Sequence, residues 1–364
     1  MSTLFQFELK KVFCRRSYII AMLIMICILV LNEVTPIILG NYKPKKESEK
    51  ALSGTVVDDE YLSSLQAKEE HNTTNPVEFF IKAATGQSEI TGHTQESLYR
   101  ARREINESMM RSNGLSDKSI EVWKMWDSRN EEPFTYLYSG SYTAFFEMTG
   151  FLNFMILIVT GIGLSGIFAD EKSTNMDQLI FCTKHGRTKL FGIKLAAGML
   201  LGFVSTFILL LVELILCLIL YGPGGAEMMI QILIPQCMMH LSMGQAVVFM
   251  ILILFFEEFI LVSIVLLVSQ LTMNKAVTTA SMFVLMFCGM LNLVPERMGI
   301  LYILWNAIPV ATAGSWLFTD YHLISVFGLH LNVLVYTPLL WVIAGIALLL
   351  LTKVLYGKYQ VKSR

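Results

Sequence analysis

Charged side chains are scarce in this chain. Only 16% of its 364 residues are Asp, Glu, Lys or Arg, whereas 54% are hydrophobic, and the mean hydropathy is +0.57. A soluble globule of this length needs more polar side chains to cover its surface. The composition therefore excludes that class and predicts an integral membrane protein.

Two chemical signatures are also missing. No Gly-x-x-x-x-Gly-Lys-Ser/Thr run occurs, so the chain has no phosphate-binding loop of its own. The six histidines are scattered, no pair has the spacing of ligands on one helix, and we predict no metal site. We expect no catalytic residue, no bound cofactor and no nucleic-acid partner, so the chain is predicted not to be an enzyme.

Cysteine is absent from residues 41–142, so no disulfide framework holds that segment. This distribution favours the cell membrane of a bacterium over a disulfide-rich eukaryotic surface protein. The six cysteines are elsewhere, at Cys14, Cys27, Cys182, Cys217, Cys237 and Cys288.

Long apolar runs are the dominant feature of the sequence. Each has the length needed to cross about 30 Å of hydrocarbon, and the first is longer than the apolar core of a signal peptide. We therefore expect the first run to remain as a membrane span. The six predicted spans are 17–40, 144–168, 191–221, 243–271, 276–294 and 331–355.

The basic residues predict the orientation of these spans. Outside 41–142, every Lys and Arg except Arg297 lies on one side of a six-span arrangement. Cytoplasmic loops are enriched in Lys and Arg, so an even number of crossings and two cytoplasmic termini are predicted. The tail 356–364 and the loop 169–190 are then cytoplasmic, and 222–242 is extracytoplasmic or interfacial.

Residues 41–143 form the longest polar segment, which this orientation places outside the cytoplasm. Runs such as 96–105 and 121–126 predict helices, and the cluster at 72–76 predicts a turn. The fold class predicted from these features is an all-α membrane protein with six spans and a mostly helical extracytoplasmic insertion.

The first 16 residues predict an amphipathic helix. Leu4 and Val12 share an apolar face with three further residues, and Glu8, Lys10 and Lys11 lie on the other face. The segment is either an ordinary basic flank that sets topology or an interfacial helix that a partner can push. Its candidate residues are Phe5, Leu9, Phe13, Arg15 and Arg16.

The polar interruption between the second and third spans predicts a short helix with an acidic start. Ser173 or Thr174 is a capping residue, with Asp177 three residues after Thr174, and Gly186 ends the helix before basic residues. Met176, Leu179 and Ile180 are predicted to share one face. An ordinary solvated loop remains the alternative.

Acidic residues inside the predicted spans require an explanation because a carboxylate in hydrocarbon is costly. Glu213, Glu257 and Glu258 lie within spans, and at least one of the adjacent pair is expected to face inward. They are either part of a translocation path or proton site, or hydrogen-bonded packing residues. Glu33 and Glu147 lie near span ends and are predicted to be interfacial.

The order of these features resembles the membrane subunit of an ABC transporter of the ABC-2 superfamily. A basic interfacial helix precedes the first span, a helix led by Glu171 follows the second, and a basic turn ends at Lys194 before four more spans. Small residues end the second span, at Gly161, Gly163, Ser165 and Gly166. The likeness covers nearly the whole chain outside 41–142.

The resemblance implies a coupling helix that docks on a separate cytoplasmic ATPase, which would bind ATP and Mg²⁺. It also implies a second membrane subunit, identical or not, and short helices at 295–330 that dip into the outer leaflet. A Pro common after the coupling helix in the family is absent here. The implied ATPase contacts are Asp170, Glu171, Met176, Asp177, Leu179, Ile180 and Arg187.

The function that this resemblance implies is export of a hydrophobic or amphipathic cargo, such as a peptide, a drug or a lipid-like molecule. Two other functions stay open. An ion-coupled secondary transporter would use Glu213, Glu257 or Glu258, and a sensor or immunity protein would bind an extracellular peptide through 41–143. Cargo, direction of transport and the identity of the second subunit do not follow from the sequence.

Overall fold

The computed structural model describes residues 3–40, 42–66, 75–87, 94–176, 189–291, 293–309 and 314–358, and the single positions 179, 182 and 186. This part of the chain is mostly helical. Its named strands are β1 (Ile324–Val326) and β2 (Leu329–Leu331), which pair antiparallel in one hairpin. The prediction of a helical membrane protein is confirmed, with this small hairpin as an addition.

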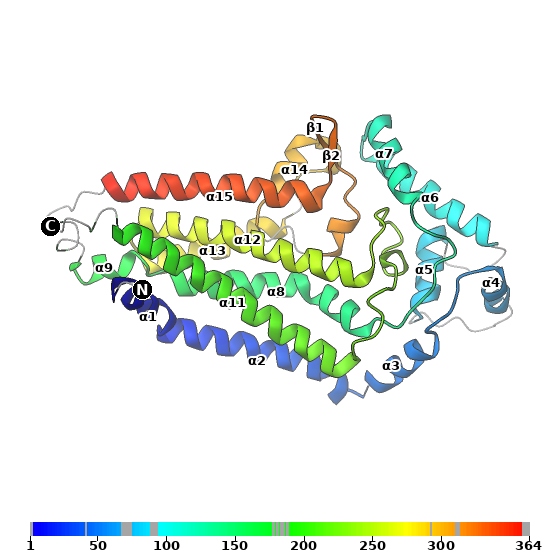
Figure 1. Cartoon of the computed structure of the whole chain (residues 1–364), viewed down its shortest axis with the longest axis horizontal. Coiled ribbons are helices and arrows are strands. Elements are labelled where there is room, and N and C mark those ends of the chain that lie inside the picture. The colour runs from blue at the N-terminus through cyan, green and yellow to red at the C-terminus, as the bar shows by residue number, and fades with distance from the viewer. Residues whose placement is uncertain are drawn as a thin grey trace.

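Five helices in the described part of the chain are long and apolar enough to cross a membrane. The shortest has 23 residues, which corresponds to about 34 Å of helix. They lie roughly side by side (Figure 1), and apolar residues such as Leu23, Phe207 and Ile343 are exposed on their outer faces. A multi-pass membrane protein is therefore confirmed. The five are α2 (Arg16–Ile38), α8 (Gly140–Leu164), α11 (Lys189–Tyr221), α12 (Met243–Thr272) and α15 (Val333–Lys358).

The predicted span 276–294 is shorter than expected. Helix α13 (Lys275–Met290) has 16 residues, about 24 Å, and Leu291 already has extended backbone angles. Pro295 follows soon after, and a proline disfavours helix in the residue before it. The chain continues through η2 (Glu296–Met298) and α14 (Ile300–Asn306). Because α12 ends where α13 begins and α15 starts at the opposite end of the bundle, this segment returns across the bundle (Figure 1).

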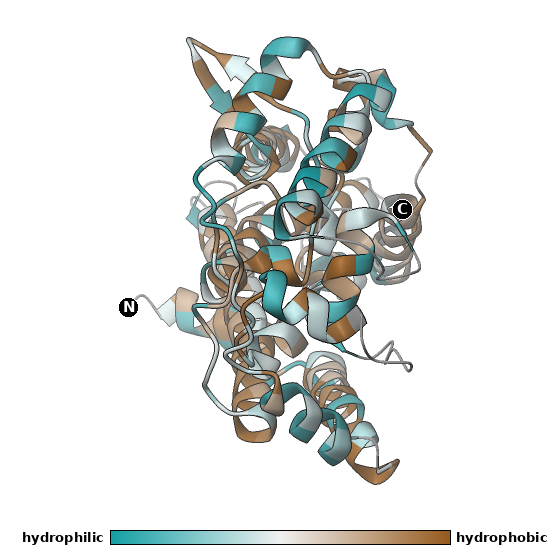
Figure 2. Ribbon diagram, turned by 90° about the vertical axis from the view of Figure 1, so that its right-hand side faces the viewer, coloured by the Kyte–Doolittle hydropathy of each residue, from teal (hydrophilic) through white to brown (hydrophobic). Residues whose placement is uncertain are grey.

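One end of the bundle carries helix α1 (Thr3–Phe13) together with the end of α15 (Figure 1). The other end carries a set of shorter helices, which we call the cap and which mixes hydrophilic with hydrophobic residues (Figure 2). Asn75, Thr94 and Ser116 cap the last three of these helices with side-chain hydrogen bonds. The cap helices are α3 (Tyr42–Ala51), α4 (Asp59–Gln66), α5 (Pro76–Thr85), α6 (Gln95–Ser112) and α7 (Asp117–Asp127).

The cap shares its core with two later segments of the chain. Arg102 is fully buried, pairs with Asp127 at 2.5 Å and donates to the carbonyl oxygen of Pro235 at 3.1 Å. Trp123 Nε1 donates to the carbonyl oxygen of Tyr321 at 2.8 Å. Residues 222–242, which include η1 (Ile230–Ile232), and the described segment from η3 (Ser315–Phe318) to Tyr321 therefore pack against the cap.

Candidate functional site

The end of the bundle opposite the cap holds a network of ion pairs, which we call the junction. Its acidic part is α9 (Ala169–Ser173), a single helical turn that follows α8 after a hydrogen-bonded turn at residues 165–168. Glu171 is buried, with its Oε1 2.5 Å from Lys194 Nζ and 3.5 Å from Lys11 Nζ. One carboxylate therefore joins α9 to both α1 and α11.

Lys194 lies at the centre of the junction and is fully buried. Its ammonium group is 3.2 Å from Glu8 Oε2, donates to the Ile167 carbonyl oxygen at 2.9 Å and lies 5.8 Å from the centroid of the Phe168 ring. A buried ammonium group is tolerated only with such partners, because its desolvation costs several kcal/mol. Glu8 was predicted on the polar face of the first helix, and the structure corrects this, since Glu8 is buried against Lys194.

Asp170 extends the network to two further elements. Its carboxylate pairs with Arg15, which lies between α1 and α2, and with Lys275 at the start of α13. Arg15 also donates from Nη1 to the carbonyl oxygen of Gly163 at 3.1 Å. A Cβ at Gly166 would lie 2.5 Å from Arg15 Nη2, so glycine is needed for this approach.

Aromatic side chains connect the last helix to the same place. Phe168 and Phe191 each lie about 5.5 Å, centroid to centroid, from the ring of Tyr356 near the end of α15. The Tyr356 hydroxyl donates to the carbonyl oxygen of Gly186 at 3.1 Å. The junction therefore contacts α1, α9, α11, α13 and α15.

The surroundings of Lys11 in the junction shift its pKa. Burial lowers the pKa of Lys11, and the neighbouring positive charge of Lys194 lowers it further, against the opposing effect of Glu8, Glu171 and Asp170. The net pKa lies below the ordinary value of 10.5. Lys11 and Lys194 therefore lie close together in the junction, and both are beside the Glu171 carboxylate.

The predicted ATPase-contact residues separate into three groups. Asp170 and Glu171 are engaged within the chain by the ion pairs above, whereas Met176 and Leu179 are 48% and 64% exposed. Asp177, Ile180 and Arg187 lie outside the described residues. Met176 and Leu179 are therefore exposed apolar residues in the described part of this loop.

Among the candidates of the first helix, the three apolar residues are half-buried and only one arginine enters the junction. Phe13 packs edge-on against Tyr18, with ring centroids 6.1 Å apart, and Arg15 takes part in the ion pairs. Arg16 is exposed at the start of α2. The half-buried residues are Phe5, Leu9 and Phe13.

Two adjacent carboxyl groups lie in the middle of the bundle, and both are fully buried. Glu257 Oε1 accepts from Asn153 Nδ2 at 2.9 Å, and Glu258 Oε1 accepts from the Thr160 hydroxyl at 2.7 Å. A Cβ at Gly202 would lie 2.2 Å from Glu258 Oε1, so α11 approaches α12 closely here. These two hydrogen bonds connect α8 to α12 in the bundle interior.

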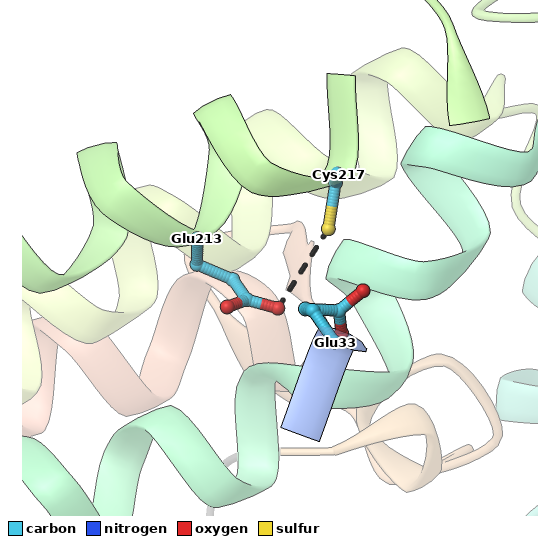
Figure 3. A group of neighbouring side chains, drawn as sticks. All are labelled: Glu33, Glu213 and Cys217. Atoms are coloured by element: carbon cyan, nitrogen blue, oxygen red, sulfur yellow. Dashed lines mark hydrogen bonds between the residues drawn. The ribbon is translucent and has the colours of Figure 1, made fainter. Parts of the chain in front are cut away.

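Glu213 is not near that pair but lies beside Glu33 and Cys217 (Figure 3). Glu33 is only 4% exposed, because α2 packs this face against α11. Histidine spacing, on which the prediction of no metal site was based, could not identify this group, because the group contains no histidine. The signal that was present is the four-residue spacing of Glu213 and Cys217, which places both on one helix face.

A cavity of about 180 Å³ opens where the cap meets the bundle. Its wall is apolar at Pro36, Met228 and Leu233 and charged at Lys45 and Glu49. Burial raises the pKa of the Glu49 carboxyl, against the opposing effect of Lys45. A cavity of this character suits a molecule with an apolar part and a polar end.

Comparisons with family models, with curated proteins and with solved structures give no match to this chain.

Proposed function

We propose that this chain is the membrane subunit of an ATP-driven exporter and that a separate cytoplasmic ATPase moves it through the junction. The observation that carries the proposal is the set of contacts made by α9. Ion pairs tie this single turn to α1, α11 and α13, so a displacement of the loop would act on several bundle elements together. Force received at one short segment would thereby reach the whole bundle.

The surface beside the junction supports a protein partner. Met176 and Leu179 are apolar and exposed a few residues beyond α9. Apolar side chains of a short helix commonly fill a groove on another protein. In the proposal, these two side chains contact the ATPase, and Asp170 and Glu171 hold the loop in place from within.

The arrangement of the chain fits the predicted orientation. α1 and the end of α15 lie at the same end of the bundle (Figure 1), as an even number of crossings requires. The basic residues Lys11, Arg15, Lys194 and Lys275 lie at that end as well. We therefore place this end in the cytoplasm of a bacterial cell and count the segment from α13 to α14 as the sixth crossing.

The proposed cargo is hydrophobic or amphipathic, such as a peptide, a drug or a lipid-like molecule. The cavity between cap and bundle combines an apolar wall with Lys45, Lys46 and Glu49 at its rim. A second membrane subunit, identical or different, would complete the path for this cargo. The ATP and Mg²⁺ belong to the ATPase partner.

The energy source tests the proposal directly. Membrane vesicles that contain the chain and a candidate ABC ATPase from the same organism would be loaded with a fluorescent amphipathic dye. We expect dye movement that requires ATP and continues after an ionophore has collapsed the ion gradients. Movement that continues without ATP and stops with the ionophore would contradict the proposal.

A second candidate is an ion-coupled secondary transporter. It is favoured by Glu213 and Glu258, which are fully buried and form no ion pair among the described residues. Buried carboxyl groups of this kind serve as proton sites in transporters. The ionophore arm of the same vesicle experiment distinguishes the two functions.

A further inference from the structure

Three potential metal ligands converge near the cap end of the bundle. Glu33 comes from α2, whereas Glu213 and Cys217 come from successive turns of α11. One carboxyl oxygen from each glutamate and the cysteine sulfur all lie within 4.8 Å of one another (Figure 3). All three residues are buried, so the group is enclosed by the helices rather than spread over a surface.

The two carboxyl groups have unused hydrogen-bonding capacity. Glu33 Oε2 and Glu213 Oε2 are buried and have no hydrogen-bond partner among the described residues. Glu33 is 4% exposed and Glu213 is fully buried. The ionisable groups that act on Glu33 and Glu213 are each other, Glu147 and Cys217, so no basic side chain among the described residues balances the pair. Negative charge enclosed in this way has to be neutralised by protons or by a cation.

We propose that Glu33, Glu213 and Cys217 bind a divalent transition-metal ion of the Zn²⁺ class. The thiol selects against Mg²⁺ and Ca²⁺, which prefer oxygen ligands, and the two carboxylates select against Cu⁺. Zn²⁺ accepts sulfur at about 2.3 Å and carboxylate oxygen at about 2.0–2.2 Å, and three protein ligands leave one position open. Binding releases to solvent the thiol proton of Cys217 and any proton that the two carboxyl groups hold in the absence of the ion.

The distances are compatible with this ion. Ligand atoms around a tetrahedral Zn²⁺ lie about 3.5 Å apart, given bond lengths of about 2.0–2.3 Å. Cys217 Sγ is already 3.6 Å from Glu213 Oε1. The remaining contraction, from at most 4.8 Å, lies within the reach of a rotation of the Glu33 side chain.

The cavity between cap and bundle lies on the cap side of the group. Pro36 follows Glu33 on α2, Tyr221 follows Cys217 on α11, and both line the cavity between cap and bundle. An ion that enters this cavity would meet the ligands about one turn of helix further in. Once bound, it would hold α2 against α11 at the end of the bundle opposite the junction.

Cobalt binding to the detergent-purified full chain tests the site. A Co²⁺–thiolate bond gives a charge-transfer band in the near ultraviolet, and tetrahedral Co²⁺ gives strong visible bands. We expect both from the chelator-treated wild-type protein, with one ion per chain, displacement by Zn²⁺ and no displacement by Mg²⁺. Failure of the folded wild-type protein to bind Co²⁺, or displacement by Mg²⁺, would overturn the proposal.

Matched variants locate the ligands. Cys217→Ser should abolish the thiolate band, and Glu33→Gln or Glu213→Gln should weaken binding about tenfold or more, since even outer-shell partners contribute that much. Cys288→Ser and Glu258→Gln, which change a thiol and a buried carboxyl elsewhere, should leave the spectrum unchanged. A thiolate band that survives in Cys217→Ser, or that disappears in Cys288→Ser, would assign the metal to another cysteine and contradict the site.

Discussion

Lys194 is the residue on which the junction most depends. It has no exposed surface and is within ion-pair distance of Glu8 and Glu171, at 3.2 Å and 2.5 Å. Removal of one member of a buried ion pair leaves the other charge uncompensated, which costs far more than loss of a surface pair. Arg111, which pairs with Glu107 on the surface of the cap, gives the comparison.

We predict that Lys194→Met lowers the free energy of unfolding by about 3–5 kcal/mol, because Glu8 and Glu171 would share a buried region with one positive charge fewer. Unfolding of the purified protein by sodium dodecyl sulfate, followed by tryptophan fluorescence, measures the change. The control variant Arg111→Ala should leave the midpoint nearly unchanged. Equal midpoints for the two variants would show that the Lys194 pairs contribute no more than a surface pair.

Two glycines of α11 offer a second comparison at this scale. A Cβ at Gly202 would lie 2.2 Å from Glu258 Oε1 and 2.6 Å from Val262 Cγ2, whereas nothing lies within 4 Å of a Cβ at Gly192. Gly202→Ala should therefore destabilise the bundle by about 1–3 kcal/mol through overpacking. Gly192→Ala should be neutral or stabilising by up to about 1 kcal/mol, since alanine favours helix. A thermal unfolding series in detergent that ranks Gly192→Ala below Gly202→Ala would contradict this packing.

At the scale of an element, the segment around η3 and the hairpin is held by a buried ion pair. His322 Nδ1 lies 2.8 Å from Asp320 Oδ1, and His322 Nε2 lies 3.0 Å from the Glu296 carbonyl oxygen. Burial lowers the pKa of His322, but the Asp320 carboxylate and the contacts with Glu296 outweigh this effect and raise the pKa above its ordinary value of 6.5. The protonated form of His322 is therefore favoured in the folded protein.

This shift predicts a pH dependence of stability. Because the folded-state pKa lies above the unfolded value, the His322 contribution is fully present below about pH 6.5 and is lost as the pH rises through the folded-state pKa. We expect the melting temperature of the wild-type protein to exceed that of His322→Gln by more at about pH 6 than at about pH 9. A difference that is constant or grows with pH would contradict the assignment.

The elements differ in how well the sequence predicts them. Apolar runs locate α2, α11, α12 and α15 closely, because spanning length is a local property of composition. The early end of α13 at Met290 is not predicted, because the apolar run continues beyond it at Leu291, Leu293 and Val294. The hairpin turn at Phe327 and Gly328 has two residues of positive φ, but strands this short give too few alternating residues to be recognised.

At the scale of the whole molecule, the candidate sites depend on contacts between distant parts of the chain. Glu8 and Lys194 are separated by 186 positions, and no local pattern predicts that they meet. The same is true of Glu33 and Glu213, which helix packing brings together from different spans. What the sequence supplies is the residue types and the side of the membrane to which they are assigned, and the pairing comes from packing.

The cap provides a prediction at this scale. Arg102 and Trp123 use partners at Pro235 and Tyr321, which lie outside residues 41–143. Expressed alone, 41–143 would leave both buried groups without these partners, so we expect weak, non-cooperative unfolding by circular dichroism. A sharp thermal transition would show instead that the cap is an independent domain, as a separate ligand-binding sensor requires. Ligand binding should therefore be tested with the full chain.

The central claim is that an ATPase binds the loop beside the junction through Met176 and Leu179. A binding measurement tests this claim most directly. A candidate ABC ATPase from the same organism would be titrated onto nanodiscs that hold the wild-type protein, Met176→Asp with Leu179→Asp, or the control Met125→Asp with Phe79→Asp. Both pairs are exposed and apolar, the second on the cap. We predict that the loop variant loses ATPase binding and that the cap variant binds like the wild type. Equal binding to all three proteins would contradict the account.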